Sequence, residues 1–214
     1  MNWTHSPQHI FAASPIVPVM VIQHRDDAVP LAKALAEGGI NVFEITLRTE
    51  AALDAIELIA EAMPDSLVGA GTILTPEQYD AAVAAGAKFI ISPGAPARLL
   101  QHAASQSVAL IPGVSTPTEI MTAMDLGYDH LKFFPAEANG GAKALKAISA
   151  PLPQVSFCPT GGINAANLAE YQSLACVKTV GGTWMIPADA IAAKDWSRIT
   201  ELTREAIALA SQGQ

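Results

Sequence analysis

Residues 75–92, which read TPEQYDAAVAAGAKFIIS, contain the structural unit that decides the fold of this chain. Thr75 is expected to cap a helix, with Pro76 at the first helical position. An alanine-rich segment continues the helix as far as Gly86, where a left-handed helix end is expected. The apolar run 88–92 then has the near-continuous hydrophobicity of a strand buried in a parallel sheet. The stretch therefore predicts one helix, one glycine turn and one strand.

The same order of helix, glycine and strand recurs along the whole chain. Thr116 repeats the cap of Thr75, and Gly38 and Gly127 are expected to repeat the left-handed helix end. The expected strands are 16–22, 40–46, 67–70, 88–92, 108–111, 130–134, 155–159 and 177–181. The expected helices are 28–37, 51–62, 76–85, 97–105, 118–126, 142–148, 165–171 and 197–210, preceded by a short helix at 7–13.

This alternation predicts an α/β protein, specifically a (β/α)8 TIM barrel with a short N-terminal helix and a single domain over residues 1–214. The alternative is an open, doubly wound sheet, which has fewer strands and carries a glycine-rich ligand fingerprint after its first strand. Residues 23–26 follow the first expected strand and contain no glycine. The barrel is therefore the favoured fold.

Composition and charge exclude several classes of protein. Half of the 214 residues are hydrophobic and 15% are charged, which excludes a disordered chain. A formal net charge of −8 argues against a nucleic-acid-binding protein but leaves room for a small anionic ligand in a local positive pocket. The longest apolar run, 16–22, is too short to span a membrane, and no secretory signal is visible. With two cysteines and no disulfide framework, the expected compartment is the cytoplasm.

Two of the expected strands carry charged side chains where a core residue is expected. The alternation of a strand places Glu44, Thr46 and Arg48 on one face, and Lys132 and Phe134 on one face of a later strand. In a barrel such faces point to the interior, and the carboxyl ends of the strands form the site. Two plainer interpretations stay open: Lys132 snorkels out at a strand end, or Glu44 and Arg48 form a structural ion pair.

Paired glycines follow the last two expected strands. Thr160, Gly161 and Gly162 follow the strand 155–159, and Gly181, Gly182 and Thr183 come at the end of the last strand. Many barrels hold a phosphate in these two loops, because glycine lets backbone N–H groups approach an anion. The plainer interpretation is that both pairs are only tight turns. Glu137, in the loop after the strand 130–134, is expected to be solvated, and its loop to flex over the site.

Other chemistries find no support in the sequence. The five histidines show no metal-ligand spacing, and no nucleophile elbow, Walker loop or dinucleotide fingerprint is present. Cys158 and Cys176 are expected to be buried small hydrophobic residues rather than nucleophiles. No metal site is therefore predicted.

With these residues in view, the sequence resembles the class I aldolases that cleave 2-keto-3-deoxy-6-phosphogluconate in the Entner–Doudoroff route. The resemblance covers nearly the whole chain, and its most specific stretches are EITLRT (44–49), GAGT (69–72), ISPG (91–94), KFFPAE (132–137) and CPTGGI (158–163). It implies a carbon–carbon lyase that acts on a small anionic keto-acid phosphate, and in many members also on 4-hydroxy-2-oxoglutarate. It also implies a homotrimer without metal or organic cofactor.

The resemblance further implies roles for individual residues. Lys132 matches the Schiff-base lysine and Glu44 the acid/base. Residues that match the substrate-binding positions are Arg48 and Thr72 for the keto-acid carboxylate, Pro93 and Phe134 for the pyruvyl pocket, and Thr160, Gly161, Gly162, Gly181, Gly182 and Thr183 for the phosphate. The chain departs from many members at Thr183, where they have serine.

A Schiff-base lysine explains why these residue types occur together. Cleaving a carbon–carbon bond beside a ketone leaves a carbanion, and a protonated imine supplies the electron sink without a metal. Two other functions stay open from the residues alone. A phosphosugar isomerase or epimerase would use the phosphate loops and a carboxylate base but no imine, and a non-catalytic barrel would bind a phosphorylated metabolite without a covalent adduct.

Overall fold

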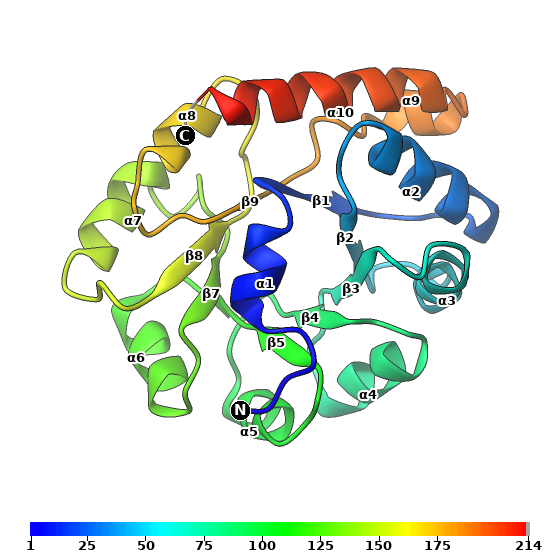
Figure 1. Ribbon diagram of the computed structural model, residues 1–214. Coiled ribbons are helices and arrows are strands. Elements are labelled where there is room, and N and C mark those ends of the chain that lie inside the picture. The colour runs from blue at the N-terminus through cyan, green and yellow to red at the C-terminus, as the bar shows by residue number, and fades with distance from the viewer. Residues whose placement is uncertain (213–214) are drawn as a thin grey trace.

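Parallel strands surround the centre of the molecule, with helices on their outer side (Figure 1). The computed structural model describes residues 1–212. The strands are β1 (Ile16–Met20), β2 (Val42–Thr46), β3 (Leu67–Gly71), β4 (Phe89–Ile91), β5 (Ala109–Ile111), β6 (Gly113–Val114), β7 (His130–Phe133), β8 (Ser156–Pro159) and β9 (Val180–Gly182).

These strands form two parallel sheets. One has the order β5-β4-β3-β2-β1-β9 and the other the order β6-β7-β8. Pro112 separates β5 from β6, as expected of a residue that has no N–H to donate to a sheet. On the other side, isolated parallel bridges join Phe157 to Val177 and Thr160 to Gly181. The α/β class with parallel strands is confirmed, and closure into one (β/α)8 barrel stays a prediction.

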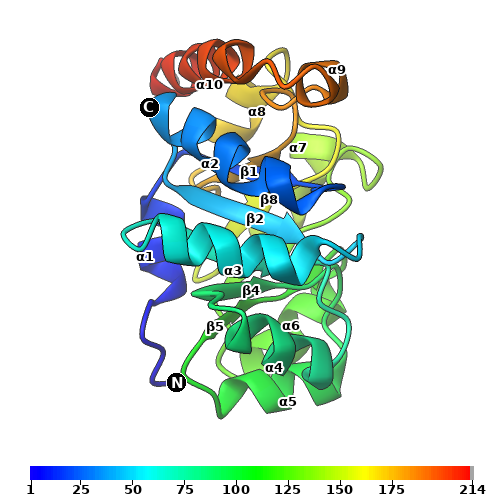
Figure 2. The ribbon, with the colours of Figure 1, turned by 90° about the vertical axis from the view of Figure 1, so that its right-hand side faces the viewer.

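The helices alternate with the strands and cover the outer faces of the sheets (Figures 1 and 2). They are α1 (Pro7–Ala12), α2 (Ala28–Glu37), α3 (Ala52–Ala62), α4 (Pro76–Ala84), α5 (Ala97–Ala104), α6 (Pro117–Asp125), α7 (Gly141–Ser149), α8 (Leu168–Gln172), α9 (Ala188–Ala192) and α10 (Trp196–Ser211), with a 3₁₀ turn at Arg25–Asp27. Thr75 and Thr116 cap α4 and α6 as predicted, and Thr116 forms a full capping box with Glu119.

Helix α1 crosses the amino-terminal ends of the strands (Figure 1). Phe11 of α1 packs edge-on against His130, the first residue of β7, with the ring centres 5.2 Å apart. The backbone N–H of Thr4 donates to the carbonyl of Ser107, just before β5. Because α1 covers the amino-terminal ends of the strands, a site can form at their opposite, carboxyl ends.

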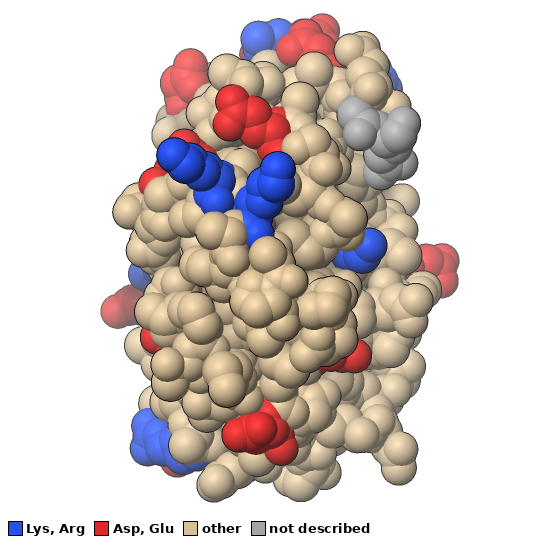
Figure 3. All heavy atoms as spheres, turned by 90° about the vertical axis from the view of Figure 1, so that its left-hand side faces the viewer, with Lys and Arg blue, Asp and Glu red and all other residues tan. Residues whose placement is uncertain are grey.

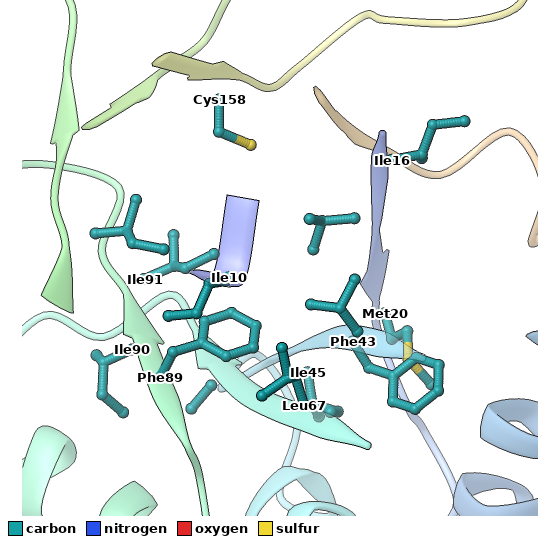
Figure 4. Packing of buried hydrophobic residues seen from close by; sticks show 14 of the residues in the cluster. Ile10, Ile16, Met20, Phe43, Ile45, Leu67, Phe89, Ile90, Ile91 and Cys158 are labelled. Atoms are coloured by element: carbon teal, nitrogen blue, oxygen red, sulfur yellow. The ribbon is translucent and has the colours of Figure 1, made fainter. Parts of the chain in front are cut away.

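The core fills the space between the strands and extends out to the helices. Figure 4 shows Ile10 of α1 close to Phe89 and Ile91 of β4, and all three side chains are buried. Buried apolar side chains of this size each contribute roughly 1.5–3 kcal/mol by leaving water. The core therefore holds α1 against the sheet and fixes the strands that carry the charged residues.

The predicted left-handed end at Gly38 is wrong. Gly38 has a φ of −77°, and the left-handed residue is its neighbour Gly39, with a φ of 104°. Gly38 is needed for another reason, because a Cβ there would come within 2.5 Å of the Thr203 side chain of α10. Gly86 and Gly127 do adopt the predicted left-handed conformation. A glycine after a helix thus serves either chain reversal or close packing.

On the side of the molecule that α6, α7 and α8 cover in Figure 1, charged side chains of both signs gather in the upper part, and the middle is mostly uncharged (Figure 3). Met121 of α6 is 56% exposed, one of the large apolar side chains that the fold leaves in solvent. Among the helices of residues 1–212, none has the combination of length and hydrophobicity that crossing a bilayer demands.

Candidate functional site

A lysine and a glutamate form a buried ion pair in the middle of the molecule. The Nζ of Lys132, on β7, lies 3.0 Å from Oε1 and 3.4 Å from Oε2 of Glu44, on β2. The side chains are only 5% and 2% exposed. Snorkelling of Lys132 is therefore wrong, and so is the interpretation that pairs Glu44 with Arg48. Burying two charges is costly, so the pair holds only because each charge compensates the other.

The end of β3 leaves room for the glutamate. Gly71 stands at this end, next to Thr46 of β2 in the sheet register. A Cβ on Gly71 would lie 2.6 Å from Cγ and 2.8 Å from Cδ of Glu44, too close for a real side chain. The carboxylate therefore occupies the space that any other residue at position 71 would fill.

Two further residues named from the sequence lie near the lysine. The amine of Lys132 lies 5.3 Å from the ring centre of Phe134. Gly113 of β6 is the register partner of Lys132. A Cβ on Gly113 would overlap the backbone of Pro93, so the missing side chain lets the Pro93 loop approach this strand closely. Phe134 thus borders the amine, and Pro93 packs against the strand next to that of Lys132.

Cys158 lies beside the ion pair on the neighbouring strand. It is the register partner of Lys132 on β8, and its side chain is buried. Burial raises the pKa of its thiol to about 12, so the group stays neutral at physiological pH. Cys158 therefore acts as an apolar wall, as the sequence predicted.

Arg48 and Thr72, which follow β2 and β3, form a hydrogen bond with each other. The Nε of Arg48 donates to Oγ1 of Thr72 over 3.1 Å. Thr72 adopts a left-handed conformation, with a φ of 60°, which a β-branched residue rarely does. Such strain persists where the surrounding structure imposes it, often at functional sites. Arg48 is exposed, and within residues 1–212 no acidic side chain forms an ion pair with it.

The glycine loop after β8 meets the start of β9. Thr160 bridges to Gly181, and a Cβ on Gly181 would overlap the side chain of Thr160. The hydroxyl of Thr160 is buried and donates to the carbonyl of Cys158 over 3.4 Å. Gly161 and Gly162 have φ values of 104° and 80°, so both positions favour glycine.

The end of β9 borders a cavity of about 610 Å³. Gly182 lies under the ring of Trp184, and a Cβ on Gly182 would overlap that ring. The next residue, Thr183, is exposed and lines the cavity together with Val19 of β1 and Asp27. Thr183 is therefore open to a ligand from this side, whereas Thr160 is enclosed.

One polar contact near the glycine loop was missed from the sequence. Glu137 is exposed, as expected, but its carboxylate also accepts a hydrogen bond from the hydroxyl of the buried Tyr171 of α8. The two residues are 34 positions apart, and nothing in the local sequence pattern of either signals the contact.

The chemistry that this arrangement supports is that of an amine nucleophile with an adjacent acid/base. A proton passed from Lys132 to Glu44 leaves a neutral amine and a carboxylic acid, with no change in the net charge of the pair. A neutral amine attacks carbonyl carbons, and the acid can protonate the departing oxygen. No cluster of three or more His, Cys, Asp or Glu side chains suited to a metal occurs among the described residues.

Comparison with known proteins agrees with this chemistry. Residues 8–202 match the family model described as KDPG and KHG aldolase. The chain belongs to this family. A 2-dehydro-3-deoxy-phosphogluconate aldolase of Pseudoalteromonas atlantica is 54% identical, over 97% of this chain and 96% of that protein. A KHG/KDPG aldolase of Escherichia coli is 52% identical, over 96% of this chain and 97% of that protein.

A solved structure of a KDPG aldolase carries direct chemical information. The enzyme of Legionella pneumophila superimposes with a TM-score of 0.94 at 52% identity, over 96% of this chain and 99% of that one. That crystal structure holds pyruvate, captured at low pH as a covalent carbinolamine intermediate. A carbinolamine is the adduct of an amine with a carbonyl carbon, so a KDPG aldolase with this fold uses an amine nucleophile.

Proposed function

We propose that this chain is a class I aldolase that cleaves 2-keto-3-deoxy-6-phosphogluconate into pyruvate and glyceraldehyde 3-phosphate, and that it also acts on 4-hydroxy-2-oxoglutarate. The buried contact of 3.0 Å between the Lys132 amine and the Glu44 carboxylate carries the proposal. Membership of the KDPG and KHG aldolase family agrees with both substrates and makes the protein a carbon–carbon lyase.

Imine formation starts with the ion pair of Lys132 and Glu44. The neutral amine of Lys132 attacks C2 of the keto acid and forms a carbinolamine. Glu44, now protonated, gives its proton to the C2 oxygen, which leaves as water, and a protonated imine remains on the lysine. A general acid within hydrogen-bond distance of the nitrogen suits this step.

Cleavage uses the same carboxylate as a base. Glu44 removes the proton of the C4 hydroxyl, the C3–C4 bond breaks and the aldehyde departs. The electron pair of the broken bond passes into the imine, which becomes an enamine. Protonation at C3 and addition of water then release pyruvate and restore the lysine. One carboxylate performs these transfers in sequence, directly or through one water.

Arg48 and Thr72 hold the carboxylate of the keto acid in this proposal. The Nε of Arg48 is fixed by Thr72, which leaves the two terminal nitrogens of the guanidinium to bind a carboxylate. Phe134 and Pro93 line the pyruvyl pocket on the lysine side. The apolar lining keeps bulk water away from the imine during the cleavage step.

The two glycine loops bind the phosphate. Gly161 and Gly162 supply backbone N–H groups, Thr183 supplies a hydroxyl, and Gly181 and Gly182 keep the end of β9 free of bulky groups. Binding energy from this remote group positions the reacting carbons at the lysine. Thr160 supports the loop from inside the core.

The larger organisation completes the proposal. The isolated bridges that join 157 to 177 and 160 to 181, together with the short separation of β5 from β6 by the single residue Pro112, support a single-domain (β/α)8 barrel. We also propose a cytoplasmic homotrimer that works without metal or organic cofactor. Its mass in solution is then three times that of the 22.3 kDa chain.

The test is cleavage of 2-keto-3-deoxy-6-phosphogluconate by the purified chain in the presence of a metal chelator. We expect pyruvate and glyceraldehyde 3-phosphate in equal amounts, and no activity in Lys132→Ala. Conversion of a phosphosugar without carbon–carbon cleavage would support the isomerase alternative. Binding of the phosphorylated substrate without turnover would support a non-catalytic barrel. Either result would overturn the proposal.

A further inference from the structure

We propose that Glu137 and Tyr171 form a strut that holds Gly162 in its anion-binding conformation and thereby sets the affinity for the phosphate end of the substrate. The inference rests on the proposed function, because it concerns the phosphate subsite of the same reaction. Neither residue contacts the reacting atoms, so both are positioning residues.

The side chain of Glu137 lies on the glycine loop. A Cβ on Gly162 would stand 2.6 Å from Cγ and 2.7 Å from Cβ of Glu137. The methylene stem of the glutamate therefore occupies the position that a side chain at residue 162 would take. Gly162 is held in the left-handed region, with a φ of 80°, by packing as well as by its own freedom.

The far end of the same side chain is fixed by Tyr171. The tyrosine hydroxyl donates to Oε1 of Glu137, and Tyr171 itself is a fully buried residue of α8. Burial and the adjacent Glu137 carboxylate raise the pKa of Tyr171, so its hydroxyl remains a donor throughout the physiological range. The contact ties the loop after β7 to helix α8.

Backbone hydrogen bonds also connect the 136–137 segment to the glycine loop. The N–H of Glu137 donates to the carbonyl of Gly161 over 3.0 Å, and the N–H of Ala136 donates to the carbonyl of Thr160 over 2.8 Å. The carbonyls of both loop residues therefore point towards the 136–137 segment. The Gly161 carbonyl is thus held by the same residue whose side chain covers Gly162.

Two asparagines hold the next carbonyl. The side-chain nitrogens of Asn164 and Asn167 donate to the carbonyl of Gly162 over 3.3 and 3.1 Å. Within residues 1–212, the N–H groups of Gly161 and Gly162 donate to no protein acceptor. With the carbonyls fixed and the donors unused, the loop is preorganised to receive an anion.

The negative charge of Glu137 does not explain why a glutamate lies beside the glycine loop. A carboxylate next to a phosphate repels it, so the useful parts of this side chain are its stem and its hydrogen-bond acceptor. Glutamine keeps both parts and removes the charge. The pair of substitutions Glu137→Ala and Glu137→Gln therefore separates positioning from electrostatics.

The test compares KM and kcat for two substrates in Tyr171→Phe, Glu137→Ala and Glu137→Gln. 4-Hydroxy-2-oxoglutarate carries no phosphate and serves as the internal reference. Losing one hydrogen bond should raise KM for 2-keto-3-deoxy-6-phosphogluconate about 2- to 12-fold in Tyr171→Phe and Glu137→Ala. KM for the reference, kcat for both substrates and borohydride trapping of pyruvate should stay within about 2-fold of the wild type. Glu137→Gln should keep KM for the phosphorylated substrate at or below the wild-type value.

Tyr128→Phe is the matched control. Tyr128 is also fully buried, and its hydroxyl donates to the Leu100 carbonyl over 2.7 Å, away from the glycine loops. The Tyr128→Phe substitution should lower the thermal stability of the protein without changing KM for either substrate. If Tyr171→Phe changed KM equally for both substrates, or changed neither, the proposed role of the Glu137–Tyr171 contact would be overturned. A wild-type chain that traps no pyruvate would instead overturn the proposed function, so the two failures are distinguishable.

Discussion

A Cβ on Gly71 would lie 2.6 Å from Cγ of Glu44, closer than two non-bonded carbon atoms approach each other. The glutamate that pairs with Lys132 therefore depends on the missing side chain of a residue on the neighbouring strand. This dependence makes Gly71 part of the geometry of the site although it carries no functional group.

Gly71→Ala is expected to displace the Glu44 carboxylate and to lower kcat about 100-fold, because misplacing a catalytic group by about 1 Å has an effect of this size. Steady-state kinetics on 2-keto-3-deoxy-6-phosphogluconate measure it. Gly94→Ala is the matched control, since a Cβ on Gly94 meets no atom within 4 Å. Equal activities of the two variants would contradict the dependence.

Glu44→Gln should slow turnover by roughly 10²–10⁴-fold, because an amide cannot transfer the protons that the reaction requires. Substrate binding should persist, because Gln keeps the size of the side chain. Single-turnover kinetics together with a binding measurement separate the two effects. Near-normal turnover would remove Glu44 from the acid/base role.

Thr183→Ala should weaken binding of the phosphorylated substrate more than binding of 4-hydroxy-2-oxoglutarate, because only the former carries the phosphate that we propose Thr183 binds. A lost hydrogen bond to a charged group corresponds to about 1.5–3 kcal/mol, or roughly 10- to 150-fold in kcat/KM. Comparing kcat/KM for the two substrates measures the difference. Equal losses on both would argue against a phosphate contact at Thr183.

The thiol of Cys158 should resist alkylation in the folded protein. Its pKa is raised from 9.0 to about 12, so at pH 8 only about 0.01% is thiolate, the reactive form. Iodoacetamide at pH 8, followed by peptide mapping, should modify the half-buried Cys176 first. Unfolding in urea should expose Cys158 and make it reactive. Modification of Cys158 in the native state at the rate of Cys176 would show that the wall beside Lys132 is open.

Much of the fold was predictable because each strand and helix has its own local signal. Helix α2 lies where its alanine-rich pattern placed it, and Thr75 and Thr116 cap their helices as their motifs indicated. Helix α8 begins at Leu168 rather than at 165, because the side chains of Asn164 and Asn167 hydrogen-bond the preceding loop. Such contacts compete with helical hydrogen bonds and cannot be told from helix propensity alone.

The site was predictable to the extent that it depends on strand alternation. Glu44 and Lys132 were both expected on inward faces, but their contact joins residues 88 positions apart and depends on sheet register. The space left by Gly71 and the contact of Glu137 with Tyr171 arise only when distant segments pack together. The pattern of a single sequence indicates on which face of a strand a side chain lies, but not its distance from a partner on another strand.

In the proposed reaction, Lys132 forms an imine with the keto acid. The most direct measurement is the intact mass after incubation with pyruvate and borohydride, followed by peptide mapping. We expect a single reduced pyruvyl adduct on Lys132 and none in Lys132→Ala. An adduct on another lysine, or no adduct on the folded protein, would contradict the proposed reaction.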